Sequence, residues 1–205
     1  MIKHYYLCFS DDFKLSTEDV NFLLDENKKV DKAPGLIESS EDDTSEDLSI
    51  RNCSVGFSES ERVKDILLPY FEKANELCGW NYDVNMIENI QFSEFSKDQY
   101  YDWHIDGGLD HFSPSLHTGS EYENLVRKLS LIVQLSKPED YEGGDVFFSK
   151  PPSSGGLDIY GETLPQFRQQ GAVIVFPSYV RHKVGRVTSG TRKAATAWHN
   201  GPPMK

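Results

Sequence analysis

The sequence predicts a mainly β (α+β) fold, a distorted double-stranded β-helix of jelly-roll type with N-terminal helices packed outside it. Two observations lead to this prediction. Short apolar or alternating runs separated by turn residues fill the second half of the chain, and two helical patterns precede them. Because 205 residues can bury one sizeable core, we expect a single domain over 1–205. Residues 1–85 would support a jelly-roll core at about 86–200.

The chain is expected to begin with a strand and a short helix. Residues 2–9 read as the strand, which the acidic pair at 11–12 would end. Ser16 is a typical helix-capping residue, and Asp19 three positions later is its capping-box partner. Because apolar residues follow at helical spacing, we expect a helix over 16–27.

An acidic, serine-rich run occupies 38–47. Such a run has too little apolar surface to order itself, so we expect a solvated, mobile loop, with a binding tail as the alternative. A strand is expected directly after it, at 50–57.

A second helix is expected behind Ser58 and Glu61, which have capping-box spacing. Its apolar stripe recurs every three or four residues and would pack on the outside of a sheet. The stripe consists of Val63, Ile66, Leu67, Phe71, Ala74 and Leu77. Pro69 lies inside this pattern and is expected to kink the helix, and Gly79 is expected to end it.

The core strands follow from period-two alternation or from short apolar runs bounded by turn residues. They are expected at 90–95, 101–106, 129–135, 145–148, 172–176 and 192–199. Two longer loops separate them. The first, 109–124, leaves the strand at 101–106 and is either a lid or a surface insertion. The second covers 150–156.

Charge and cysteine content restrict the class of function. The net charge is −12, which disfavours nucleic acid as the main partner. The cysteines, Cys8, Cys53 and Cys78, are widely spaced and include no CxxC, which fits a reducing compartment. The N-terminus is too short and too mixed for a signal peptide, and no apolar run approaches membrane-spanning length. We therefore expect a cytoplasmic protein with no membrane partner.

The most informative motif is His104-Ile105-Asp106. On a strand, side chains two positions apart point to the same face, so the imidazole and the carboxylate would converge. Two histidines and one carboxylate form the facial triad that binds non-haem Fe(II). The candidate for the third ligand is His182, which follows the apolar strand at 172–176. The alternative for His104 and Asp106 is a pair on the surface of a strand, or a buried histidine that the carboxylate holds in place.

Arg192 follows His182 by ten positions and begins the strand-like run at 192–199. Arg192, Ala194, Thr196 and Trp198 would share one face of that strand. A buried arginine among small residues could hold a ligand carboxylate in a bidentate pair. An ordinary cation at a strand edge is the alternative.

These segments resemble the Fe(II)- and 2-oxoglutarate-dependent oxygenases, specifically the prolyl-4-hydroxylase-like branch that includes the small bacterial and phage PKHD-type hydroxylases. The resemblance covers roughly the second half of the chain, in the family's order. Its segments are Tyr101-Asp-Trp-His-Ile-Asp106, Tyr141-Glu-Gly-Gly-Asp145, Gly171-Ala-Val-Ile-Val-Phe-Pro177 and His182 to Arg192, ending in Trp198.

The resemblance implies a jelly-roll (cupin-like) fold and a hydroxylase. Fe(II), 2-oxoglutarate and O2 would be required, with ascorbate as a further cofactor, and 2-oxoglutarate would be decarboxylated to succinate and CO2. His104, Asp106 and His182 would be both metal ligands and catalytic residues. Asp106 fills a position that related halogenating enzymes leave open, which favours hydroxylation. Arg192 would bind the distal carboxylate of 2-oxoglutarate.

Further site residues also follow from the resemblance. Tyr101 would donate its hydroxyl to 2-oxoglutarate, but its odd spacing from His104 requires a bulge in the strand. Trp198 lies near the family's substrate mouth, and Arg186 is a second candidate for substrate contact. The substrate is expected to be a prolyl residue of a peptide or protein, or a related small molecule. His111, His117 and His199 are not expected to bind iron.

Three other functions are kept open. The same centre could oxidise a nucleobase, although the net charge disfavours it. A non-catalytic jelly-roll binding module would keep the strands without the chemistry. A zinc hydrolase could use the same two histidines and aspartate, but no general-base glutamate stands at a diagnostic spacing.

Overall fold

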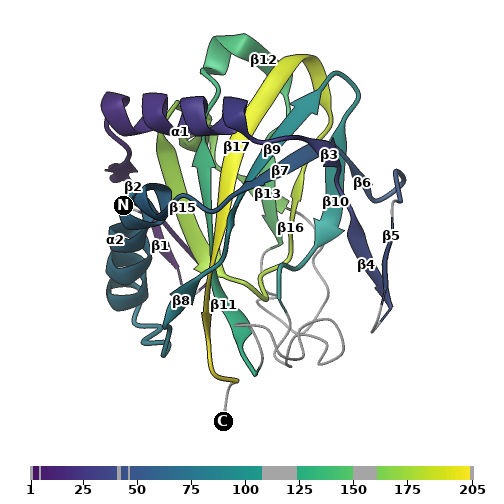
Figure 1. The fold of residues 1–205 in the computed structure, drawn as a ribbon. Coiled ribbons are helices and arrows are strands. Elements are labelled where there is room, and N and C mark those ends of the chain that lie inside the picture. The colour runs from purple at the N-terminus through teal and green to yellow at the C-terminus, as the bar shows by residue number, and fades with distance from the viewer. Residues whose placement is uncertain are drawn as a thin grey trace.

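The computed structural model describes residues 2–4, 6–40, 43–45, 47–107, 124–149 and 161–203. Within these residues the chain forms two α-helices and two facing sheets, with a separate two-stranded sheet (Figure 1). All the recorded strand pairs are antiparallel. The two larger sheets face each other without closing into a barrel, so the predicted jelly roll with outer helices is confirmed.

The larger sheet has ten strands. In spatial order its main path is β1 (Ile2–His4), β2 (Leu7–Lys14), β15 (Ala172–Pro177), β11 (Val126–Gln134), β17 (Val187–Gly201), β9 (Ile90–Ser96), β7 (Ser54–Ser58) and β3 (Ala33–Pro34). Two further strands, β8 (Met86–Ile87) and β12 (Tyr141–Gly143), pair with β17, which therefore pairs with four strands in all.

The smaller sheet has five strands. In spatial order they are β14 (Gly161–Thr163), β13 (Val146–Ser149), β16 (His182–Val184), β10 (Tyr100–His104) and β6 (Arg51–Asn52). The remaining elements are the hairpin of β4 (Ile37–Ser40) and β5 (Asp43–Ser45), and two short 3₁₀ helices, η1 (Pro138–Asp140) and η2 (Pro165–Arg168).

The helices α1 (Thr17–Lys29) and α2 (Glu61–Leu77) lie on the side of the larger sheet that faces away from the smaller one (Figure 1). The predicted cap of α1 is present, because Ser16 Oγ accepts a hydrogen bond from the Asp19 amide at 3.0 Å. The predicted cap of α2 is wrong. Ser58 ends β7, its hydroxyl accepts from the Ser60 amide, and Ser60 becomes the cap without a side-chain hydrogen bond.

Three apolar clusters hold these layers together. The largest joins the helices to the outer face of the larger sheet, where α2 contributes Val63, Leu67, Phe71 and Ala74. These residues belong to the stripe that the sequence predicts. The two smaller clusters lie between the sheets, one around Phe148 and Phe176 and the other around Phe95 and Val184. Residues of both sheets also line a cavity between them.

Two predicted boundaries are wrong. The first strand does not end at the acidic pair 11–12, because β2 continues to Lys14 and pairs with β15. The acidic run is not a loop throughout, since β4 and β5 pair there as a hairpin. Backbone hydrogen bonds order this segment, so the shortage of apolar side chains does not prevent strand formation.

The expected strand at 50–57 is interrupted at Cys53. Its first part, β6, pairs with β10 in the smaller sheet, and its second part, β7, pairs with β9 in the larger one. This segment therefore crosses from one sheet to the other. Among the described residues, neither helix has the length and apolarity that crossing a bilayer requires.

Candidate metal centre

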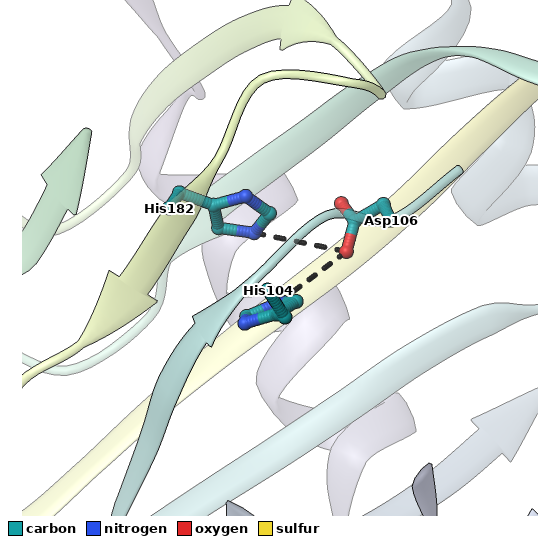
Figure 2. A group of neighbouring side chains, drawn as sticks. All are labelled: His104, Asp106 and His182. Atoms are coloured by element: carbon teal, nitrogen blue, oxygen red, sulfur yellow. Dashed lines mark ion pairs between the residues drawn. The ribbon is translucent and has the colours of Figure 1, made fainter. Parts of the chain in front are cut away.

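His104 and His182 are brought together by strand pairing. β10 ends at His104, and His104 lies opposite His182 of β16 in the antiparallel register. Asp106 lies two residues beyond the end of β10, where its amide donates to the Ser178 carbonyl at 3.0 Å. Figure 2 shows the carboxylate of Asp106 facing both imidazole rings, with a dashed line to each.

The three side chains converge closely. Asp106 Oδ1 lies 3.5 Å from His104 Nε2 and 3.7 Å from His182 Nε2. One ligand atom from each residue lies within 4.8 Å of those of the other two, and among the described residues this is the group of histidine, cysteine or acidic side chains that could hold a metal. These separations suit three ligands on one face of a single ion.

Both rings are oriented by local hydrogen bonds. His104 Nδ1 donates to the Asp102 carbonyl at 2.8 Å, and His182 Nδ1 donates to the Val180 carbonyl at 3.0 Å. Because Nδ1 then carries the proton, Nε2 of each ring keeps its lone pair. It faces the point where the three side chains converge, called the shared point below. Each carbonyl belongs to the residue two positions earlier, so the backbone just before each histidine orients its ring.

The charge states also suit a metal. Burial alone would raise the pKa of the Asp106 carboxyl, but the nearby imidazoles of His182 and His104 hold this pKa well below its ordinary value. Burial lowers the pKa of His182 to about 4. At neutral pH the site thus presents a carboxylate and a neutral imidazole, the forms that bind metals.

The residues present fit a divalent transition metal. Asp106 Oδ2 is buried and has no hydrogen-bond partner, although a buried carboxylate oxygen normally has one. A cation at the shared point would compensate this charge. Two imidazole nitrogens and one carboxylate, with no thiolate, are the donor set of non-haem Fe(II) sites.

A cavity of about 810 Å³ opens onto these ligands between the sheets. Alternate residues of β17 line it, as the predicted alternation requires. They are Arg192, Ala194, Thr196 and Trp198. Arg192 is 2% exposed, and its Nη2 is buried without a hydrogen-bond partner. A buried cation with an unused donor is suited to bind the carboxylate of a ligand.

Comparison with known proteins agrees with this geometry. Residues 90–200 match the model of the 2OG-Fe(II) oxygenase superfamily. The chain belongs to this superfamily.

The relatives of this 2OG-Fe(II) oxygenase domain include a PKHD-type hydroxylase of Psychrobacter sp. (strain PRwf-1), 34% identical over 108 residues. That match covers 52% of this chain and 36% of the relative, so the chain spans about a third of the relative's length.

Solved structures share the fold. A Pseudomonas putida prolyl-4-hydroxylase superposes with a TM-score of 0.64 at 16% identity, covering 94% of this chain and 91% of that one. A Trichoplax adhaerens prolyl hydroxylase, in complex with a peptide fragment of hypoxia inducible factor, superposes with a TM-score of 0.62 at 14% identity, covering 95% and 83%.

Tyr101 lies in the oxygenase cavity because β10 is irregular. The pairing of β10 with β16 shifts register between Tyr101 and His104, which is the bulge that a role for Tyr101 requires. Its ring stacks on that of His104 with centroids 3.5 Å apart. Burial raises the pKa of Tyr101 to about 12, so the phenol keeps its proton and can donate it.

The two candidate substrate residues lie in different places. Trp198 lines the cavity, and its Nε1 is buried without a partner. Arg186 is exposed and is not among the residues that line the cavity. It donates to the Asp98 carbonyl at 2.7 Å and covers the ring of Tyr100. This placement gives Arg186 a structural role and offers no support for substrate contact.

Two arginines of the cavity wall were missed by the sequence interpretation. Arg127 pairs with Glu88 through two hydrogen bonds, donates to the Asp106 carbonyl at 3.1 Å and lies over the ring of Trp198. Arg51 lies over the ring of Tyr101. Neither has a local sequence signal, because its partners come from distant strands.

Several predictions concern residues that the structure does not describe. His111, His117 and most of the predicted lid lie within 108–123, and the second loop lies within 150–160. These predictions concern residues outside the described ranges. His199 is described and packs against Phe71, on the helical side of the larger sheet.

Proposed function

We propose that this chain is an Fe(II)- and 2-oxoglutarate-dependent dioxygenase that hydroxylates a C–H bond and decarboxylates 2-oxoglutarate to succinate and CO2. One observation carries the proposal. The ligand atoms of His104, Asp106 and His182 converge within 4.8 Å, on a cavity whose wall also contains the buried Arg192. Membership of the superfamily supports the same chemistry.

Each residue has a distinct role in this proposal. His104 and His182 would bind Fe(II) through Nε2, and Asp106 would bind it through its carboxylate. When bound, iron with 2-oxoglutarate and O2 supplies the oxidising power for C–H hydroxylation. Arg192 would pair with the distal carboxylate of 2-oxoglutarate, and Tyr101 would donate its hydroxyl to the same co-substrate.

The rest of the protein would orient these groups and exclude water. Arg127 donates to the Asp106 carbonyl at 3.1 Å and so fixes the backbone of this ligand. The cavity also has an apolar rim at its exposed end, which is suited to an uncharged part of a substrate. The rim consists of Leu36, Ile50, Phe57 and Ile105.

We propose a prolyl residue of a peptide or protein, or a related small molecule, as the substrate class. Support comes from the neighbours in fold, one a prolyl-4-hydroxylase and another a prolyl hydroxylase in complex with a peptide. The cavity is larger than 2-oxoglutarate alone needs, which leaves room for a second molecule beside it.

The first test is an anaerobic titration of the metal-free protein with Fe(II) and then with 2-oxoglutarate. A visible charge-transfer band reports the keto acid chelated to iron. The wild-type protein should show the band, His182→Ala should lose it, and Arg192→Leu should need far more 2-oxoglutarate. An iron-loaded, folded wild type without a band would mean that the co-substrate is wrong.

A second test addresses the carboxylate ligand. Asp106→Ala should abolish Fe(II) binding and 2-oxoglutarate turnover, since two neutral imidazoles alone leave the cation without its charged ligand. Turnover is measured as succinate formed from 2-oxoglutarate, and retained turnover would contradict the assignment of Asp106. Asp102→Ala is the matched control, because this exposed aspartate is two residues before His104 and lies outside the ligand group.

A further inference from the structure

The outer face of the smaller sheet points away from the cavity, and neither α1 nor α2 covers it, because both helices lie beyond the larger sheet (Figure 1). Along β16, His182 and Val184 are buried and line the cavity, whereas Arg181 is exposed and Lys183 is half-buried. On the neighbouring β13, Phe147 is half-buried between two buried residues. Because side chains alternate between the faces of a sheet, Arg181, Lys183 and Phe147 lie on the outer face.

Aromatic rings and cations alternate on this face. Lys183 Nζ lies 4.9 Å from the centroid of the Trp103 ring and 5.2 Å from that of the Phe147 ring. The Arg181 guanidinium lies 5.9 Å from the Trp103 ring. A further pair, an arginine 4.5 Å from a tyrosine ring, extends the arrangement to the start of β10. This outer-face patch consists of Tyr100, Trp103, Phe147, Arg181, Lys183 and Arg186.

The cations of the outer-face patch have no acidic partner. In the part of the chain that the structure describes, none of the three forms an ion pair. Asp145, just before β13, is paired with Arg168 instead, at 2.7 Å. The chain has 33 acidic residues and only 21 lysines and arginines, so a group of unpaired cations is unexpected in it. Neighbouring positive charges repel each other, and an anionic partner on this face would offset that repulsion.

The aromatic rings of the patch are partly open to solvent. Trp103 and Phe147 are both half-buried. A Cβ at Gly185 would lie 2.9 Å from Phe147 Cε2, so the ring lies close against bare backbone that only glycine provides. Because no ion pair holds Lys183, its ammonium group can leave the rings. A cation–π contact at an exposed site is weaker than the stacking of a nucleic-acid base on the same ring.

We infer that the outer-face patch binds a single strand of nucleic acid, whose bases stack on Trp103 and Phe147 while Arg181, Lys183 and Arg186 pair with its phosphates. Aromatic rings and cations side by side on an open sheet suit such a strand, because every base has a flat face and every link carries a negative charge. An acidic polypeptide would supply the charge without the flat rings, and so would use only half of the patch.

The inference concerns a partner of the protein and goes beyond the proposed function. The strand would lie on the face of the smaller sheet opposite the metal ligands, so it is not the molecule that the iron centre oxidises. The net charge of −12 describes the whole chain and does not exclude a local basic patch. The repulsion from the rest of the surface should keep the affinity modest, with a Kd of roughly 1 to 100 μM at physiological salt.

The test titrates the full chain, loaded anaerobically with Fe(II), into a fluorescein-labelled oligouridylate of about twelve nucleotides. Fluorescence anisotropy measures the Kd at several salt concentrations. The logarithm of the association constant should fall with the logarithm of the salt concentration with a slope of about −2, because each of three phosphate contacts contributes about −0.7. An abasic strand of the same length and charge should bind roughly ten-fold more weakly, since it has no bases to stack.

Two variants separate stacking from charge. Trp103→Leu should weaken binding of the oligouridylate roughly ten-fold and leave the salt slope unchanged. Lys183→Met keeps the stem of the side chain and removes its charge, so the slope should become shallower, from about −2 to about −1.4. Lys28→Met is the matched control, because it removes the same charge from α1, beyond the larger sheet, where the Lys28 side chain is 70% exposed. It should keep the wild-type Kd and slope.

Four results would overturn the inference. They are no binding of the oligouridylate at low salt, wild-type binding by both patch variants, equal binding of the abasic strand, and equally tight binding of an oligoglutamate, which would make the patch a surface for acidic polypeptides. If Trp103→Leu does not fold, Phe147→Leu replaces it with the same expectation. None of these results bears on the iron centre, which the charge-transfer titration tests separately.

Discussion

His182 and His199 are both buried, but their rings meet different surroundings. His182 Nδ1 donates to the Val180 carbonyl, and its Nε2 faces the carboxylate of Asp106 at 3.7 Å. His199 packs edge-on against Phe71 at 5.2 Å, and its Nδ1 has no partner. Burial lowers the pKa of each to about 4. The position of the ring, rather than the residue type, decides which histidine can bind a metal.

These histidines predict that the metal-free protein is sensitive to acid. Their folded pKa of about 4 lies below the unfolded value of 6.5, so between these values the unfolded chain binds more protons. The free energy of unfolding should therefore fall as the pH is lowered from about 6.5 to 4. Thermal unfolding across this range measures it.

His199→Phe separates the contribution of one histidine from that of the metal ligands. The substitution keeps a ring against Phe71 and removes a buried nitrogen that has no partner. The fall in Tm between pH 7 and pH 5 should therefore become smaller, by the part that protonation of His199 contributes. An unchanged pH dependence would show that His199 is not the group that titrates.

At the level of elements, tight approaches between chains decide where glycine is required. Gly190 and Gly79 both have a left-handed φ, +73° and +67°. At Gly190, where β12 pairs with β17, a Cβ would overlap the carbonyl oxygen of Asp140. At Gly79, just after α2, nothing lies within 4 Å of the added Cβ. Both positions have the same left-handed backbone, but only Gly79 has room for a Cβ.

Alanine at these positions should therefore have unequal costs. Gly79→Ala is expected to cost about 1 kcal/mol, the left-handed strain alone. Gly190→Ala adds the overlap with β12 and is expected to cost roughly 2 to 4 kcal/mol. Urea unfolding measures both. Equal costs would mean that β12 moves away freely from β17.

At the scale of the whole molecule, the site depends on the smaller sheet and its loops. His104 and His182 lie on neighbouring strands, and Asp106 follows in a segment hydrogen-bonded to Ser178. Unfolding separates these ligands, so a metal that binds them binds the folded protein and stabilises it.

Metal addition should therefore raise the Tm. Under anaerobic conditions Fe(II) at 100 times its Kd should add about 2.7 kcal/mol to the free energy of unfolding, and a chelator should reverse the effect. Differential scanning calorimetry at several Fe(II) concentrations measures it. A rise of the same size in Asp106→Ala would place the ion elsewhere on this acidic chain.

The sequence by itself determined the features that depend on local pattern. Alternation and helical spacing predict most strands and both helices, because the side chains of one short segment decide which face it buries. The spacing of His104, Asp106, His182 and Arg192 also pointed to residues that the structure gathers around one cavity. A resemblance in the order of these motifs led to the correct superfamily.

Only the tertiary structure decided the features that depend on distant partners. The bulge that turns Tyr101 inward exists because β10 pairs out of register with β16, and β6 and β7 separate because two different sheets supply their hydrogen bonds. The rings and cations of the outer-face patch likewise come from three strands and the segments beside them. No local pattern reports such contacts, because their free energy comes from side chains that meet only after the sheets have formed.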